Sequence, residues 1–267
     1  MTPKLSVVLC LVLICAATTL GSAMVFLFKR NCSEKLNHIT MGLASGIMLS
    51  VSVFGLILPA MDEPGETFKN LSWLPVTAGF LIGCIFIWIL DIAVPHMHLA
   101  KEEFTEGPKA EKMNKNIKFF LAVTMHNIPE GIATGLAVSQ AVIHADDPVF
   151  MWSAISMAVA IAIQNLPEGA AVSIPLFETG VGKGKSFLLG FLSGIVEPIF
   201  GVLAFLFATT IGTSFMPWLL AFAGGAMIYV TVEELIPDIK SDDNSHLGIW
   251  AFIVGFMLMM LMETLLG

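Results

Sequence analysis

Charged residues are scarce in this chain of 267 residues: Asp, Glu, Lys and Arg make up only 13% of it, whereas apolar residues make up 56%. A soluble domain carries roughly 25% charged residues. The shortage excludes a large soluble domain and indicates an integral membrane protein embedded in a lipid bilayer. The remaining charge is acidic, with a net charge of −8, which argues against a partner made of nucleic acid.

Two sequence patterns are also missing. The four cysteines show no Cys-x-x-Cys or zinc-knuckle spacing, so we interpret them as small apolar side chains. The His-Glu-x-x-His pattern of zinc hydrolases is absent, and only one histidine, His126, lies deep inside an apolar segment. Both absences argue against a zinc enzyme.

Long apolar segments fill most of the chain. A transmembrane helix needs about 20 predominantly apolar residues, and eight segments qualify. We predict an all-α polytopic membrane protein, a single transmembrane domain over residues 1–267, with a metal site inside the bundle and a flexible cytoplasmic loop at 96–116. The predicted helices are at about 5–28, 36–60, 74–94, 117–142, 149–177, 187–210, 216–237 and 247–266.

The distribution of positive charge predicts the orientation. All but two of the 13 lysines and arginines, the two being Lys4 and Lys69, fall in the first, third, fifth and seventh loops. Cytoplasmic loops carry the excess of such residues. We therefore expect odd-numbered loops in the cytoplasm and both termini outside, in the inner or plasma membrane of the cell.

A polar motif occurs twice inside these apolar segments. His-Asn-Ile-Pro-Glu-Gly occupies 126–131, and Gln-Asn-Leu-Pro-Glu-Gly occupies 164–169. Ionisable groups at membrane depth cost about 2.5–3.5 kcal/mol each on insertion scales, so they indicate function. Two copies of one design indicate a shared site between two helices. The polar members are His126, Asn127, Glu130, Gln164, Asn165 and Glu168.

The spacing within each copy places its polar side chains on one helix face. His126 and Glu130 are four residues apart, as are Gln164 and Glu168, and such pairs are neighbours on a helix surface. Because the two helices are consecutive, they run antiparallel and their polar faces can meet. The prolines remove a backbone N–H and expose a carbonyl, and the glycines permit close helix approach.

Two further residues extend the donor set. Glu197 precedes a proline in the sixth segment, and Met48 offers a thioether in the second. Three carboxylates in a low-dielectric cavity repel unless a divalent cation or protons neutralise them. Imidazole with carboxylate suits zinc, iron(II), manganese and cadmium, whereas a pure oxygen cage would suit calcium or magnesium.

A second group of polar residues lies near the inner ends of the third and seventh segments. We expect it either to line a metal pathway or to provide interfacial solvation. The group consists of Asp91, His96, His98, Glu233 and Glu234.

The paired motifs resemble those of the ZIP (ZRT/IRT-like) divalent metal transporters, most closely the bacterial and GufA-like branch. The resemblance covers nearly the whole chain and implies two adjacent metal positions bridged by the glutamates of the motifs. Gln164 stands where many members have His, and Asn165 replaces an Asp of some members. The resemblance implies a first position from Met48, His126, Glu130, Gln164 and Glu168, and a second from Asn127, Glu130, Asn165, Glu168 and Glu197.

These observations predict a transporter that is not an enzyme. Its substrate would be a divalent metal ion, zinc or else cadmium, iron or manganese, carried into the cytoplasm by alternating access. The alternatives are an intramembrane metal-dependent hydrolase, a metal-selective channel, and a sensor or storage protein. Glycine-rich helices, for example at Gly224 and Gly225, could pack within the chain or across a homodimer.

Overall fold

The computed structural model describes residues 3–27, 34–62, 71, 73–97, 105–106, 108, 114–239 and 246–266, and these residues are almost entirely helical. The predicted all-α membrane fold is confirmed. Within the described ranges the chain crosses the bundle eight times. The long helices are α1 (Pro3–Ala23), α2 (Glu34–Ser50), α4 (Trp73–Ala93), α5 (Lys115–Ile143), α6 (Pro148–Glu178), α7 (Lys183–Ile211), α8 (Met216–Val230) and α10 (Leu247–Leu266).

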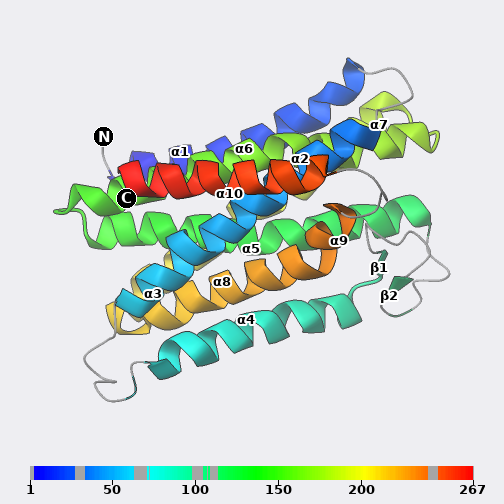
Figure 1. Cartoon of the computed structure of the whole chain (residues 1–267). Helices are drawn as coiled ribbons and strands as arrows, with labels where there is room; N and C mark the ends of the chain where they lie inside the picture. The colour runs from blue at the N-terminus through cyan, green and yellow to red at the C-terminus, as the bar shows by residue number, and fades with distance from the viewer. Residues whose placement is uncertain are drawn as a thin grey trace.

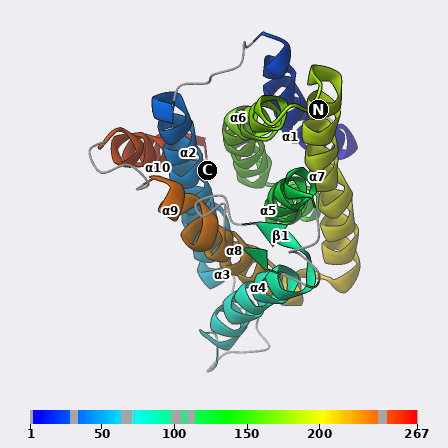
Figure 2. The same cartoon turned by 90° about the vertical axis from the view of Figure 1, so that its right-hand side faces the viewer.

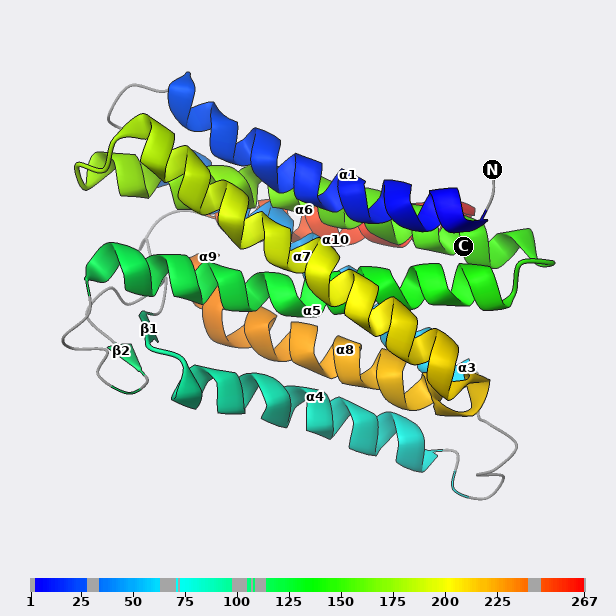
Figure 3. The same cartoon turned by 180° about the vertical axis from the view of Figure 1, so that it is seen from behind.

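Seven of the helical stretches in the described residues are long and apolar enough to cross a membrane. The eighth long helix, α5, has 29 residues but a lower hydropathy, because it carries the first polar motif. It lies alongside the other long helices in all three ribbon views (Figures 1, 2 and 3). The residues that make α5 weakly apolar are therefore the ones that the bundle shields from lipid.

The long helices form two groups, which are clearest in the end-on view of Figure 2. One group contains α1, α5, α6 and α7, with α1 packed along α6 and α5 packed along α7. The other contains α2, α4, α8 and α10, with α2 packed along α10 and α4 packed along α8. Contacts of α6 with α2 and of α5 with α8 join the two groups.

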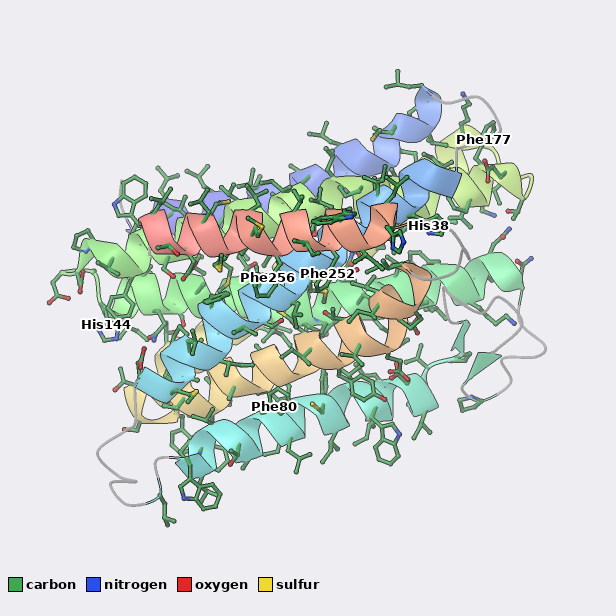
Figure 4. The ribbon with its side chains drawn as sticks, viewed as in Figure 1. His38, Phe80, His144, Phe177, Phe252 and Phe256 are labelled. Carbon is green, nitrogen blue, oxygen red and sulfur yellow. The ribbon has the colours of Figure 1, made fainter. Side chains whose placement is uncertain are left out.

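Small residues bring the paired helices of the second group close together. Gly46 of α2 lies against the backbone of Phe252 on α10, and Gly83 of α4 lies against the backbone of Phe222 on α8. Figure 4 shows Phe252 and Phe256 where α10 crosses α2, and the Phe256 ring meets Phe54 edge-on with a centroid distance of 5.9 Å. Such close backbone approach is the usual packing mode of membrane helices.

The two ends of the bundle differ. Helix α1 begins and α10 ends at the same end (Figures 1 and 3), as an even number of crossings requires. The opposite end carries β1 (His96–Met97), which pairs antiparallel with β2 (Thr105–Glu106). The flexibility predicted for 96–116 and the orientation across the membrane stay predictions, although α5 already begins at Lys115.

Short irregular segments interrupt two of the helices that were predicted to be uniform. A π-helix, η2 (Val51–Ile57), joins α2 to α3 (Leu58–Asp62), and a second, η6 (Thr231–Leu235), joins α8 to α9 (Ile236–Ile239). The described residues also contain two 3-10 turns, η1 (Met24–Phe26) and η5 (Thr213–Phe215). By contrast, α5 and α6 stay helical through Pro129 and Pro167, so these prolines do not break their helices.

Candidate functional site

The two copies of the polar motif meet where α5 faces α6. The Gln164 Nε2 atom on α6 donates a hydrogen bond to Glu130 Oε1 on α5. Both side chains are buried, each with 1% of its surface exposed. The contact agrees with the sequence-based expectation that the polar faces of the two consecutive helices lie opposite each other.

The asparagines of the two copies make corresponding bonds to different neighbours. Asn127 Nδ2 donates to the backbone carbonyl of Ser193 on α7 at 3.0 Å, and Asn165 Nδ2 donates to the backbone carbonyl of Ile14 on α1 at 3.4 Å. The side-chain nitrogen of Asn127 on α5 is therefore bonded to α7, and that of Asn165 on α6 is bonded to α1.

Glu197 joins three helices. Its Oε1 accepts a hydrogen bond from the Thr18 hydroxyl on α1 at 2.8 Å, and its Oε2 accepts one from Asn165 Nδ2 on α6 at 2.6 Å. Glu197 is fully buried on α7. These two hydrogen bonds fix the side chain and tie α1, α6 and α7 together.

Several buried oxygen atoms in this cluster accept no hydrogen bond. A buried acceptor without a partner costs about 1–3 kcal/mol, and such atoms in a native structure need an explanation. Oxygen atoms that accept no proton from a neighbour have lone pairs available for a cation. The atoms are Asn127 Oδ1, Glu130 Oε2, Gln164 Oε1 and Asn165 Oδ1.

The remaining predicted ligands lie on the same helices or beside them. His126 is buried one residue before Asn127, and Glu168 is half-buried one turn after Gln164. Met48 is buried on α2, which packs against α6. The backbone carbonyl of Met48 accepts a hydrogen bond from the Ser52 hydroxyl at 2.7 Å.

Within the described residues, no three side chains from His, Cys, Asp and Glu come together as a group that could hold a metal ion. Instead, Glu130 is bonded to Gln164, and Glu197 is bonded to Thr18 and Asn165. A cation bound between α5 and α6 would therefore depend on carboxamide oxygens as well as on carboxylates. The two-position ligand set implied by the resemblance stays a proposal.

The glycines of the motifs lie at close helix contacts within the first group. Gly131 of α5 lies against the backbone of Glu197 on α7, and Gly169 of α6 lies against the backbone of Thr18 and Ser22 on α1. A Cβ atom at either glycine would overlap these backbone atoms. The close approach expected for both glycines is confirmed, and it brings α1 and α7 within hydrogen-bonding reach of the asparagines.

The described pathway residues belong to elements other than the two motif helices, namely α4, β1 and η6. Asp91 on α4 and Glu234 in η6 are buried, and Glu233 is half-buried. The backbone of His96 belongs to β1, whereas His98 lies outside the described residues. A pathway role for these residues stays a prediction.

Sequence reasoning missed Thr18, which no motif marks. A threonine in the middle of the first apolar segment was the available signal, but such a hydroxyl usually bonds to its own helix. It also missed the carbonyls of Ile14 and Ser193, since backbone acceptors leave no trace in the residue types. Both require knowledge of which helices pack together.

Comparisons with known proteins show the family of the chain. The family model described as ZIP zinc transporter matches residues 102–263. The chain is 34% identical to the zinc transporter GufA of Myxococcus xanthus, over 94% of this chain and 95% of that protein. It is 32% identical to the zinc transporter ZupT of Chlorobaculum parvum, over 94% and 93% of the two chains, and 30% identical to human zinc transporter ZIP11, over 94% of each.

The chain thus belongs to the ZIP family of membrane transporters. The resemblance inferred from the paired motifs, including its GufA-like character, is confirmed. Since the relatives are named transporters and not enzymes, the prediction that the chain is not an enzyme is confirmed as well.

Proposed function

We propose that this protein carries divalent transition-metal ions across its membrane into the cytoplasm, with zinc as the main substrate and cadmium, iron or manganese as others. The observation that carries the proposal is the group of four buried side-chain oxygens without hydrogen bonds at the meeting of α5 and α6. Family membership supports the same class of substrate.

The cluster has the properties of a transient metal site. Carboxylate and imidazole ligands suit zinc and its neighbours, and Glu130, Glu168 and His126 supply them. Carboxamide oxygens are weaker ligands for zinc, so Gln164 and Asn165 lower the affinity. A carrier benefits from this balance, because a site that must release its ion cannot hold it too tightly.

The division of the bundle into two groups supports alternating access. All the motif residues lie in the group of α1, α5, α6 and α7, while α2, α4, α8 and α10 form the other group. Rigid-body motion of one bundle against another is a general transporter mechanism. We propose that the first group moves against the second, so that the metal bound at Glu130 and Glu168 faces first the outside and then the cytoplasm.

Uptake into proteoliposomes tests the proposal. Purified protein would be reconstituted with a zinc-sensitive dye inside, and Glu130→Gln and Glu168→Gln would be compared with Glu263→Gln. Glu263 is a membrane-embedded glutamate on α10 that accepts a hydrogen bond from Ser153 at 3.3 Å, and glutamine keeps that acceptor. We expect saturable uptake by the wild type and by Glu263→Gln, and a loss of at least tenfold in the two motif variants.

The same assay separates the proposal from its alternatives. Flux that does not saturate with zinc concentration would favour a metal-selective channel. Equal uptake by all three glutamate variants would overturn the assignment of the site. Zinc binding without any flux would favour a sensor or storage protein, or a hydrolase.

A further inference from the structure

Thr18 contacts the candidate site from a helix to which the sequence assigns no ligand. Its side chain is buried in the middle of α1, and its hydroxyl donates to Glu197 Oε1 at 2.8 Å. The other oxygen of the same carboxylate accepts from Asn165 Nδ2 at 2.6 Å. Both oxygens of Glu197 are therefore bonded to neutral donors of this protein.

We propose that Thr18 is a positioning residue that holds Glu197 in this hydrogen-bonded arrangement and thereby limits metal binding at the second position. The inference rests on the proposed function, because it concerns the same cluster. A metal ion that binds Glu197 has to compete with the two hydrogen bonds that hold its oxygens. The first position does not include Glu197, so it does not meet this competition.

The release of Glu197 would leave neither donor unbonded. The Thr18 hydroxyl lies 3.3 Å from the carbonyl oxygen of Ile14, and Asn165 Nδ2 lies 3.4 Å from the same oxygen. Both donors can therefore keep this acceptor when the carboxylate turns away. Because no buried donor is orphaned, the cost of release stays moderate, and Glu197 can alternate between a bonded and a metal-facing position.

The packing of the two motif copies explains why a threonine at this place matters. In the first copy, Asn127 bonds to α7 and Gly131 lies against Glu197. In the second copy, Asn165 bonds to α1 and the glycine of the copy lies against Thr18. Thr18 thus occupies on α1 the place that Glu197 occupies on α7. The position on α7 provides the Glu197 carboxylate, and the corresponding position on α1 provides the Thr18 hydroxyl that donates to it.

The chain offers a close control for a test. The Thr18 side chain packs against Gly194 through its Cβ and Cγ2 atoms, so Thr18→Val keeps this shape and removes the hydroxyl. The neighbouring hydroxyl of Thr19 donates only to the Cys15 carbonyl, at 2.7 Å on its own helix. Thr19→Val therefore removes a similar group without touching Glu197.

The experiment is calorimetric titration of the full-length protein in detergent with cadmium alone. We expect the wild type to bind one cadmium tightly and a second much more weakly. Thr18→Val should tighten the second binding constant about tenfold, the upper end of the effect of one hydrogen bond, and leave the first unchanged. Thr18→Ser and Thr19→Val should match the wild type.

An unchanged second constant in Thr18→Val, or an equal change in Thr19→Val, would overturn the inference. Thr18→Ala removes the same donor with a smaller side chain, and it replaces Thr18→Val if the valine variant does not give a monodisperse folded protein. Absence of cadmium binding to the wild type would instead overturn the proposed function on which the inference rests.

Discussion

Gln164 on α6 donates a hydrogen bond to the carboxylate of Glu130 on α5, so a residue of the second motif copy is bonded directly to a residue of the first. Each of the two side chains keeps one oxygen that accepts no hydrogen bond. The bond therefore fixes the spacing of α5 and α6 and leaves oxygens for a cation. Gln164 is at once a neighbour of the proposed metal and its competitor for Glu130.

Replacing Gln164 with histidine should raise the preference for zinc. An imidazole nitrogen is a better zinc ligand than a carboxamide oxygen, and the change also removes the amide donor that occupies Glu130. We expect Gln164→His to bind zinc about tenfold more tightly relative to manganese. Competition of manganese against zinc uptake in proteoliposomes measures this ratio, and an unchanged ratio would show that position 164 does not contact the metal.

Enlarging Gly131 should destabilise the bundle. A Cβ atom there would overlap the backbone of Glu197, and overpacking typically costs about 1–3 kcal/mol. We expect Gly131→Leu to lower the midpoint of thermal unfolding in detergent. Gly184, at the start of α7, has no neighbouring atoms where its Cβ would lie, so Gly184→Leu should unfold like the wild type. Equal midpoints for the two variants would contradict this packing.

Acid should weaken metal uptake. Carboxylate and imidazole ligands bind a metal only when deprotonated, so protons compete with zinc at Glu130, Glu168 and His126. The zinc concentration for half-maximal uptake should therefore rise as the external pH falls from about 7.5 to about 5.5. Initial rates from dye-loaded proteoliposomes measure this concentration. A lower value in acid would mean that protons assist binding by another route.

Linking the two helix groups should stop transport. Gly55 in η2 faces the end of the Met157 side chain on α6, across the boundary between the groups. In a background without the native cysteines, Gly55→Cys with Met157→Cys should lose uptake when a reversible bifunctional thiol reagent is added, and recover it on reduction.

A link inside one group provides the control for that experiment. Gly79 on α4 and Ala221 on α8 lie in direct contact within the second group. The pair Gly79→Cys and Ala221→Cys should keep its uptake when linked in the same way. Inhibition by both links, or by neither, would contradict relative movement of the two groups.

The general architecture and the centre of the site could be predicted from the sequence. The eight apolar segments defined the long helices, since length and hydropathy are local properties. The i,i+4 spacing of the paired motifs placed Glu130 opposite Gln164, because consecutive membrane helices are antiparallel neighbours. The glycines of the motifs likewise indicated close helix contacts.

Other features depend on non-local packing and could not be predicted. The hydrogen bond from Thr18 to Glu197 joins α1 to α7, and no local sequence pattern indicates that these two helices pack together. The π-helices η2 (Val-Ser-Val-Phe-Gly-Leu-Ile) and η6 (Thr-Val-Glu-Glu-Leu) share no residue pattern, so the sequence alone does not reveal them. Pro129 and Pro167 lie inside continuous helices, because one missing N–H can be tolerated inside a packed bundle.

The most direct measurement is the position of cadmium in crystals of the wild-type protein, found from its anomalous scattering. We predict a peak between α5 and α6, at about 2.0–2.6 Å from oxygens of Glu130 and its neighbours, as expected for metal–oxygen bonds. The peak should disappear in Glu130→Gln. A strong peak elsewhere, for example beside Asp91 or Glu234, with none at Glu130, would contradict the account.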